Sequence, residues 1–314
     1  MPPTEPTDPP TRVEPLPSLG DRVRAAGHRL LPTRALSWLA GRLGRCRWSW
    51  LKDPLNRAFA ARYQLDLDEA EHADPTAYPS LNALFTRGLR PGARPLPADP
   101  GALASPCDGT VSAVGTFDAA ALLQAKGIAY PPAELLAGMG GEALGSGAYL
   151  TLYLSPQDYH RLHAPLDAVL RTERHVPGRL LTVAPPAVRA VPRLFARNER
   201  LVTVWDTAAG PMAVVAVGAL HVGSIKTTWP GVAEAARGEA AHYPEGCGPR
   251  LARGDELGRF NLGSTVILLL PHGSVRWRAD LAPGRRVAMG EPVGELESAS
   301  VAPTGAGEGS AGPR

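Results

Sequence analysis

Near the C-terminus, a glycine and a serine stand where a polar stretch gives way to an apolar one. Gly263 and Ser264 lie between the polar residues 254–261 and the apolar run 266–270, so a hydroxyl nucleophile follows a glycine carbonyl at a predicted strand entrance. Glycine has no Cβ and can take strained conformations that leave its carbonyl open to attack by the next side chain. The pair is therefore a candidate site of self-cleavage, although a glycine turn that feeds a buried strand is the more common meaning of such a pair.

Two histidines and an aspartate could supply proton transfer. His160 and His163 stand three residues apart within segment 153–165, and in a helical turn they would share a face. A pair with this spacing can ligate a metal, but the sequence offers no obvious third ligand, so acid–base chemistry is favoured over zinc. Asp108 precedes Gly109 ahead of a predicted strand, a position at which Asp-Gly ordinarily forms a turn.

The composition is typical of a globular protein with many short strands. Of the 314 residues, 44% are hydrophobic and 20% are charged, while 34 glycines and 33 prolines indicate frequent turns. The three cysteines, Cys46, Cys107 and Cys247, suggest neither a disulfide framework nor a zinc knuckle, so a reducing compartment is expected. No signal peptide is recognisable, and the longest apolar runs are far too short to span a bilayer, so we expect a protein that does not cross a membrane.

Basic charge is concentrated near the N-terminus. Residues 20–63 contain ten Lys or Arg against two Asp, a local balance of +8, whereas the whole chain carries +3. Apolar side chains recur there at spacings of three or four with arginines between them: Leu36, Leu39, Leu43, Cys46 and Trp50, with Arg34, Arg42, Arg45 and Arg47. This pattern is typical of a cationic amphipathic helix in the headgroup region of an anionic bilayer, and equally of a surface helix packed on its own domain. Nucleic acid is not expected as a partner, because no recognisable binding fold accompanies the charge.

Turn and strand signals divide the chain into segments. We expect disordered tails at 1–20 and 298–314, a helical region at 21–88 and a β-rich catalytic domain at 89–297. The predicted strands are 110–114, 148–154, 201–205, 212–217 and 265–270, and short helices are predicted near 119–126 and at 132–137. The predicted fold class is therefore α+β, with a helical N-terminal membrane-associating region followed by a β-rich catalytic core.

A series of segments follows the order of a known family. They are 78–87, 94–95, 105–110, 123–127, 153–165, 176–178, 194–200, 222–225 and 258–265. In these segments the chain resembles bacterial phosphatidylserine decarboxylases, and the resemblance runs from about residue 32 to 297. The maturation signature of the bacterial type, Leu-Gly-Ser-Thr, stands intact at 262–265. Cys107, Arg253 and the stretch 232–251 depart from the family pattern.

The resemblance implies a self-cleaving triad. Asp108 would hold His163 in the right tautomer and orientation, and His163 would act as general base on Ser264, which would attack the carbonyl of Gly263. Elimination across the resulting ester would release a β chain, 1–263, and leave an α chain, 264–314, that begins with a pyruvoyl group derived from Ser264. The two chains would remain associated, and a homodimer is the family's expectation.

The same resemblance implies a cofactor and a substrate. The covalent pyruvoyl group would form a Schiff base with the amine of phosphatidylserine and delocalise the charge left by the loss of CO2, so that pyridoxal phosphate is not needed. His160 would meet the substrate or return a proton, unless it makes only a structural hydrogen bond. Because a diacyl lipid stays in its bilayer, the membrane interpretation of the basic helix gains weight. A peripheral protein at the cytoplasmic face of the bacterial inner membrane is expected.

Other functions are compatible with the residues alone. A Ser-His-Asp hydrolase would keep Ser264, act on a lipid or another ester, and remain one intact chain. A carrier domain of the biotinyl or lipoyl type would need a modifiable lysine at a hairpin tip, where Asp108 and Gly109 offer none. A membrane adaptor would tolerate the loss of the Ser264 hydroxyl without any chemical consequence.

Overall fold

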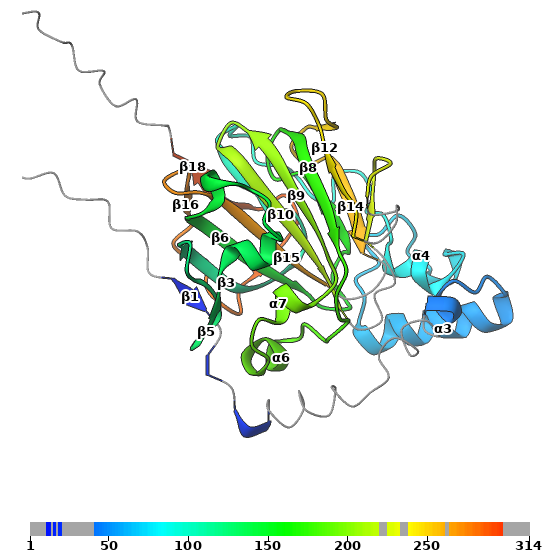
Figure 1. Cartoon of the computed structure of the whole chain (residues 1–314). Coiled ribbons are helices and arrows are strands. Elements are labelled where there is room, and N and C mark those ends of the chain that lie inside the picture. Colours follow the sequence, from blue (N-terminus) through cyan, green and yellow to red (C-terminus); the bar gives the residue numbers. More distant parts are fainter. Residues whose placement is uncertain are drawn as a thin grey trace, which may run out of the picture.

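The structure, a computed structural model, describes residues 11–13, 15–16, 18–20, 41–219, 225–232, 238–260 and 264–297. Its centre is a ten-stranded antiparallel sheet with the order β1-β3-β6-β15-β10-β9-β8-β12, in which β13 also pairs with β8 and β17 with β3 (Figure 1). The strands are β1 (Arg12–Val13), β3 (Gly109–Phe117), β6 (Gly147–Leu154), β8 (Ala168–Val176), β9 (Arg200–Thr207), β10 (Gly210–Gly218), β12 (Ala240–His242), β13 (Arg250–Leu251), β15 (Ser264–Pro271) and β17 (Arg286–Val287). The predicted α+β class with a β-rich core is confirmed.

Smaller sheets and short helices flank the main sheet. One small sheet has the order β11 (Ile225–Thr227), β14 (Glu256–Phe260), β7 (Arg161–His163), and another has the order β16 (Val275–Trp277), β18 (Pro292–Leu296), β2 (Ala102–Ala104). A hairpin joins β4 (Leu122–Ala125) to β5 (Ile128–Tyr130). The short helices are α5 (Pro132–Leu136), α6 (Pro185–Ala190) and α7 (Leu194–Arg197), with 3-10 turns η1 (Pro75–Ala77) and η2 (Glu142–Leu144).

The central strands are buried on both faces of the main sheet. Along β15, Val266, Leu268 and Leu270 belong to one core cluster, whereas Ile267 and Leu269 belong to the other. Successive strand residues point to opposite faces, so a strand covered on both sides has to be apolar throughout. Burial of each such side chain contributes roughly 1.5–3 kcal/mol. The five predicted strands are confirmed as parts of β3, β6, β9, β10 and β15.

The helical region contains α3 (Ser49–Tyr63) and α4 (Leu81–Phe85), which lie together outside the main sheet (Figure 1). Asn56 of α3 is buried, and its amide donates to the carbonyl oxygen of Pro75 at 2.9 Å. The rings of Phe59 and Phe85 pack α3 on α4, with centroids 6.1 Å apart. The Ser80 hydroxyl caps α4 by accepting from the backbone N–H of Ala83 at 3.1 Å. None of the helices within the described ranges combines the length and the apolar character needed to cross a membrane.

Two helix predictions were wrong. Segment 119–126 contains strand β4, because Gly127, with φ +77, allows a tight reversal into β5. The basic helix does not run continuously from Leu36 to Trp50. Residues 41–44 are helical, the chain turns at 45–48, and α3 begins at Ser49. Gly44, a weak helix former, stands at the interruption, while the earlier positions of the pattern lie outside the described residues.

The N-terminal segment differs from a fully disordered tail. Within the range 1–20, β1 pairs with the edge of β3, and Arg12 donates to the carbonyl oxygens of Ala279 and Leu281 at 2.8 and 3.0 Å. The edge of β3 presents unpaired backbone groups that a short strand can satisfy. The C-terminal range 298–314 lies outside the described residues, and the domain boundary at 88–89 stays a prediction.

Candidate active site

Ser264 opens the central strand β15 and is completely buried. Its backbone is paired with Leu154 of β6 on one side and with Gly218 of β10 on the other. Its side chain is 0% exposed, and among the described residues Oγ has no hydrogen-bond partner. An unpaired buried hydroxyl costs about 1–3 kcal/mol, so its presence calls for an explanation such as a chemical role. The preceding Gly263 lies outside the described residues.

His160 follows a turn that begins where β6 ends. Its side chain is 0% exposed, and Nδ1 lies 2.8 Å from the carbonyl oxygen of Asp158. Because a carbonyl oxygen only accepts, Nδ1 carries the proton and Nε2 carries the lone pair. In the part of the chain that the structure describes, Nε2 has no partner. Burial lowers the pKa of His160 to about 3, so the ring is uncharged at neutral pH.

His163 ends β7, so the helical turn considered for the two histidines is not formed. Nδ1 of His163 donates to the carbonyl oxygen of Gly254 at 2.7 Å, and the hydroxyl of Tyr159 donates to Nε2 at 2.9 Å. Burial lowers the pKa of His163, and the bond to Gly254 and the charges of Glu256 and Asp108 oppose this shift only in part. His163 is therefore also a neutral imidazole with its proton on Nδ1.

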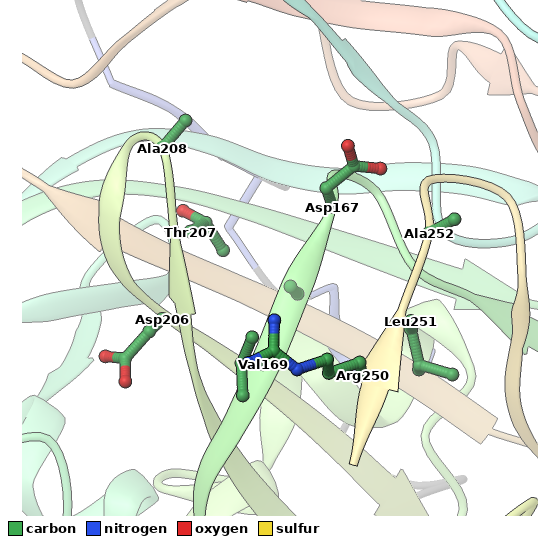
Figure 2. A pocket seen from close by; sticks show the side chains of 9 residues that line it. Asp167, Val169, Asp206, Thr207, Ala208, Arg250, Leu251 and Ala252 are labelled. Atoms are coloured by element: carbon green, nitrogen blue, oxygen red, sulfur yellow. The ribbon is translucent and has the colours of Figure 1, made fainter. Parts of the chain in front are cut away.

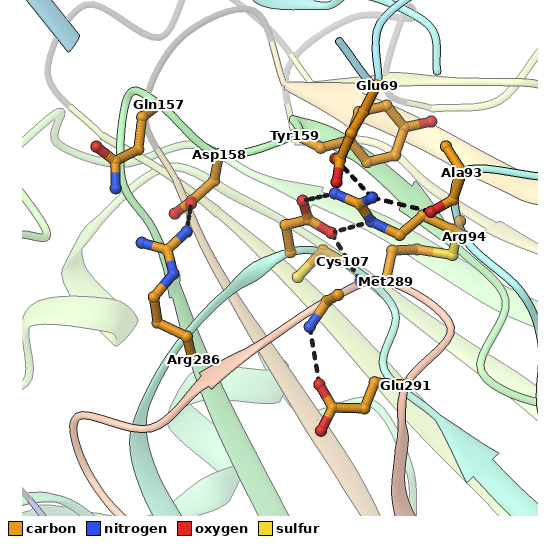
Figure 3. A network of polar contacts seen from close by, with 12 residues as sticks. Glu69, Ala93, Arg94, Cys107, Gln157, Asp158, Tyr159, Arg286, Met289 and Glu291 are labelled. Atoms are coloured by element: carbon orange, nitrogen blue, oxygen red, sulfur yellow. Dashed lines mark hydrogen bonds and ion pairs between the residues drawn. The ribbon is translucent and has the colours of Figure 1, made fainter. Parts of the chain in front are cut away.

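Asp108 binds an arginine instead of His163. Its carboxylate accepts from Nε and Nη2 of Arg94 at 3.1 and 2.7 Å and from the backbone N–H of Met289 at 2.7 Å (Figure 3). Arg94 also pairs with Glu69 at 2.6 Å. Both ring nitrogens of His163 have other partners, so the hydrogen bond expected from Asp108 is not made. The Gly254 carbonyl fixes the tautomer in its place.

Chain connectivity brings these groups to one end of the main sheet. Phe260, at the end of β14, donates its backbone N–H to the carbonyl oxygen of His160 at 3.1 Å. From Phe260 to Ser264 there are four residue steps, which span at most roughly 14 Å. Asp108 immediately precedes β3, which pairs with the end of β6 that precedes the His160 turn. The serine, the histidine and the aspartate are thus carried by neighbouring strand ends.

A cleft of about 220 Å³ opens beside Asp108 and the turn that precedes His160, and it is lined mainly by charged side chains. Asp108, Asp158 and Tyr159 contribute to it, together with arginines from separate parts of the chain. One of them, Arg286 of β17, pairs with the Asp158 carboxylate at 2.5 Å (Figure 3). The cleft therefore joins the polar network around Asp108 to the turn that carries His160.

A second hollow, of about 460 Å³, lies at the other end of β9 and β10 (Figure 2). Asp167, Asp206 and Arg250 are among its lining residues, and none of the predicted site residues lines it. Asp206 pairs with Arg171 at 3.2 Å. Its position, away from the end of β10 that pairs with Ser264, separates this hollow from the candidate site.

Comparison with known proteins decides the family. The family model described as phosphatidylserine decarboxylase matches residues 81–295, and a second model, described as PSD, matches residues 23–64. The phosphatidylserine decarboxylase proenzyme of Halorhodospira halophila is 59% identical over 282 residues, which cover 90% of this chain and 97% of that protein. The proenzyme of the same name from Azotobacter vinelandii is 48% identical over 281 residues, which cover 88% and 98% of the two chains. The chain belongs to the phosphatidylserine decarboxylase family.

Membership of the phosphatidylserine decarboxylase family implies a pyruvoyl group. The surroundings of Ser264 are compatible with its being the residue from which that group would form. Its hydroxyl is buried and unpaired among the described residues, and its backbone is held by strands on both sides. A side chain converted at this position would therefore stay fixed within the sheet. Within the described ranges, no three His, Cys, Asp or Glu side chains are grouped as ligands of one metal ion.

The structure brings further residues, which the sequence analysis did not assign, into contact with the candidate site. Tyr159, Arg94 and Phe85 contact predicted site residues, and all three stand inside segments that carry the family resemblance. Their position inside these segments was the only indication in the sequence that they belong to the site, because their residue types alone suggest no role. Gly254 acts through its backbone carbonyl, for which the sequence gives no side-chain signal.

Proposed function

We propose that this chain is a proenzyme that cleaves itself between Gly263 and Ser264. The product is a carboxy-lyase that converts phosphatidylserine to phosphatidylethanolamine and CO2. The observation that carries the proposal is the buried Ser264 hydroxyl, unpaired among the described residues, at the head of the central strand of a chain in this family. Relatives that match over nearly their full length carry the proenzyme name.

In the cleavage step, His163 takes the Ser264 proton at Nε2. This lone pair accepts from Tyr159 in the uncleaved chain, so the ring exchanges that partner for Ser264 while Nδ1 keeps its proton and donates it to the Gly254 carbonyl oxygen. Asp108 acts through its charge, which favours the protonated imidazole, although burial has the larger effect on this pKa. Contact between Asp108 and His163 is not required for this effect.

The bond changes then follow from the chain's own atoms. Oγ of Ser264 attacks the Gly263 carbonyl carbon, and the peptide C–N bond breaks to give an ester and a free amine on residue 264. A base then removes the Cα proton of residue 264 as the Cβ–Oγ bond breaks, which releases Gly263 as a carboxylate and leaves a dehydroalanine. Addition of water with loss of ammonia gives the pyruvoyl carbonyl.

In the decarboxylation step, the pyruvoyl group supplies an acceptor for the electron pair left when CO2 departs. His160 is uncharged, and in the described part of the chain its Nε2 lone pair has no partner. It can take a proton at Nε2 from the substrate's ammonium group and return that proton to the carbon that has lost CO2. Complete burial of His160 keeps bulk water from competing for this proton.

We also propose that the enzyme is peripheral at the cytoplasmic face of the inner membrane, where it draws phosphatidylserine from an anionic bilayer. Trp48 and Trp50 are 66% and 71% exposed, and their rings stack with centroids 5.9 Å apart. They border an open surface hollow together with Arg47. Exposed indoles beside arginines suit the headgroup region, where one end of the side chain is apolar and the other is hydrated.

The two chains are proposed to remain associated after cleavage. The segment that begins at Ser264 supplies four strands, and three of them pair with strands from the larger chain: β15 with β6 and β10, β17 with β3, and β18 with β2. Hydrogen bonds between main-chain groups of this kind persist along the rest of the strands when the one peptide bond at the start of β15 is broken. Formation of a homodimer stays a prediction.

The mass of the purified protein under denaturing conditions, beside a Ser264→Ala variant, tests the proposal. Two chains that divide after Gly263, with the smaller one lighter by one ammonia than a serine-initiated peptide, are expected for the wild type. Release of CO2 from phosphatidylserine vesicles should accompany them and be absent from Ser264→Ala. A single uncleaved chain that hydrolyses esters would overturn the proposal in favour of the hydrolase.

A further inference from the structure

Phe85, the last residue of α4, packs directly against the ring of His160. The two ring centroids are 3.8 Å apart, their planes are tilted by 40°, and Phe85 is 1% exposed. On another side Phe85 meets Phe59 of α3 with a centroid distance of 6.1 Å. The imidazole is therefore supported by an apolar wall that belongs to the helical region, not to the sheet that carries Ser264.

The same end of α4 also supports the backbone of the His160 turn. Nη2 of Arg87 donates to the carbonyl oxygen of Gln157 at 2.9 Å, and Nη1 donates to that of Asp158 at 3.5 Å. The Asp158 carbonyl is the group that accepts from Nδ1 of His160 and so determines which ring nitrogen keeps its lone pair. Arg87 thus fixes the acceptor that sets the tautomer, and Phe85 covers the ring.

These contacts leave one rotamer available to His160. A ring held at van der Waals distance on one side and by a hydrogen bond at Nδ1 cannot turn without losing both. The contact also denies water access to the imidazole from the side of Phe85. A smaller side chain at position 85 would open space next to the ring, where water could reach it and the imidazole could change its orientation.

We propose that Phe85 is a positioning residue for His160, which holds the imidazole in one orientation and keeps water away from it. This inference rests on the proposed decarboxylation, in which Nε2 of His160 exchanges a proton with the substrate. Phe85 does not touch the substrate in this scheme. It acts through His160, and Arg87 secures the turn on which both depend.

Phe85→Leu is the main test, with Phe85→Ala as the stronger change. Because truncation of a buried phenylalanine can prevent folding, the leucine variant keeps most of the apolar volume while removing the ring face. Phe117→Leu is the matched control. Phe117 is also a buried phenylalanine, but it lies at the far end of β3 from Asp108, where it pairs with Gly147 of β6. Each variant is made in the wild type and in the uncleaved Ser264→Ala chain.

The first readout is the titration of His160 by nitrogen-15 NMR in the Ser264→Ala chain, with the resonance assigned by comparison with His160→Gln. We expect Phe85→Leu to raise the pKa of His160 toward the ordinary value, Phe85→Ala to raise it further, and Phe117→Leu to leave it unchanged. The second readout is turnover of phosphatidylserine by the cleaved enzyme. Displacement of the ring should lower kcat by about tenfold to a hundredfold while KM changes little.

The outcomes separate this inference from the proposed function. If Phe85→Leu and Phe117→Leu give the same His160 titration, or if the titration moves and kcat does not, Phe85 is not a positioning residue. A wild-type chain without cleavage or CO2 release refutes the proposed function instead. In that case the titration, which needs neither cleavage nor turnover, still decides whether Phe85 orients the ring.

Discussion

His160 and His163 share a tautomer but differ in what their second nitrogen contacts. Both carry the proton on Nδ1, held by the carbonyls of Asp158 and Gly254 respectively. Nε2 of His163 accepts from Tyr159, whereas Nε2 of His160 is unpaired as far as the described residues reach. The two rings therefore suit different steps: His163 can exchange one partner for Ser264, and His160 can receive a group that arrives from outside.

The buried His160 should make the uncleaved chain sensitive to acid. Its pKa is lowered from 6.5 to about 3 in the folded state, so below pH 6.5 the unfolded chain binds a proton that the folded chain does not. The free energy of unfolding should therefore fall by about 1.4 kcal/mol per pH unit between roughly pH 6 and pH 3 from this residue alone. Urea unfolding of Ser264→Ala at several pH values measures the slope. His160→Gln should reduce it, and an unchanged slope in that variant would contradict the assignment.

Asp108→Asn should slow self-cleavage without abolishing it. The Asp108 charge favours the protonated His163 that forms when Ser264 loses its proton, so its removal should slow cleavage by about tenfold. A time course of chain cleavage after synthesis measures the effect. Asp206→Asn, which also removes a carboxylate paired with an arginine, is the control. A complete block, equal to that of Ser264→Ala, would instead indicate that Asp108 contacts His163 during the reaction.

At this scale the sequence was sufficient to propose candidate reactive side chains and insufficient to identify their hydrogen-bond partners. Ser264, His160 and His163 are recognisable from residue type, spacing and family resemblance. The carbonyl that orients His163 comes from Gly254, 91 residues further along the chain, and every residue type offers the same carbonyl. Asp108 was assigned to His163 from the family resemblance, and nothing in the sequence indicates that Arg94 reaches its carboxylate.

At the scale of elements, prediction succeeded where a segment is buried on two faces. The run 266–270 is apolar throughout because both faces of β15 are covered, and no helix of that length is consistent with its flanking glycine and proline. Segment 119–126 was assigned to a helix because a short apolar run has no distinctive period. Its true partner, β5, lies just beyond Gly127, so the pairing depends on a turn that the hydrophobic pattern does not encode.

The start of α3 should determine attachment to membranes. Replacing Trp48 and Trp50 with Ala, or Arg45 and Arg47 with Glu, should move the protein from sedimented phosphatidylserine-containing vesicles into the supernatant. The alanine variant lacks the contact of the indoles with the headgroup region. The glutamate variant lacks, for each arginine replaced, an attraction of about 1 kcal/mol near an anionic surface. The arginine effect should weaken at high salt, because screening shortens the range of the attraction.

Arg250→Glu is the control for this experiment, since it reverses an exposed arginine on β13, away from α3. Equal loss of binding in the control would mean that net charge alone, and not the surface at α3, governs attachment. Unchanged binding of all variants would contradict the proposed membrane contact.

At the scale of the whole molecule, the two products of the proposed cleavage would be interlaced. The smaller chain would provide β15 at the centre of the main sheet, β17 beside β3, and β18 in the middle of a separate three-stranded sheet. On gel filtration without denaturant the two chains should therefore elute together, and urea should be needed to separate them. Elution of free 264–314 from the native protein would contradict the interlaced arrangement.

Arg12 should add to this association. It belongs to the larger chain and donates to the carbonyl oxygens of Ala279 and Leu281 in the smaller one. Arg12→Ala should lower the urea concentration at which the chains separate, by an amount that corresponds to about 1 kcal/mol for partly exposed bonds. Arg276→Ala is the matched control, because Arg276 pairs with Glu295 within the same chain. An identical shift in both variants would show that Arg12 does not bridge the products.

The position of β15 also implies that folding of the sheet precedes the proposed cleavage. Its residues pair with positions far earlier in the chain, as Ile267 does with Thr151, and with β10 on the other side. Ser264 is enclosed only when all three strands have come together. If cleavage occurs as proposed, it would therefore depend on complete assembly of the sheet: a copy whose sheet is incomplete would stay uncleaved and inactive, and the appearance of the short chain would report that folding has finished.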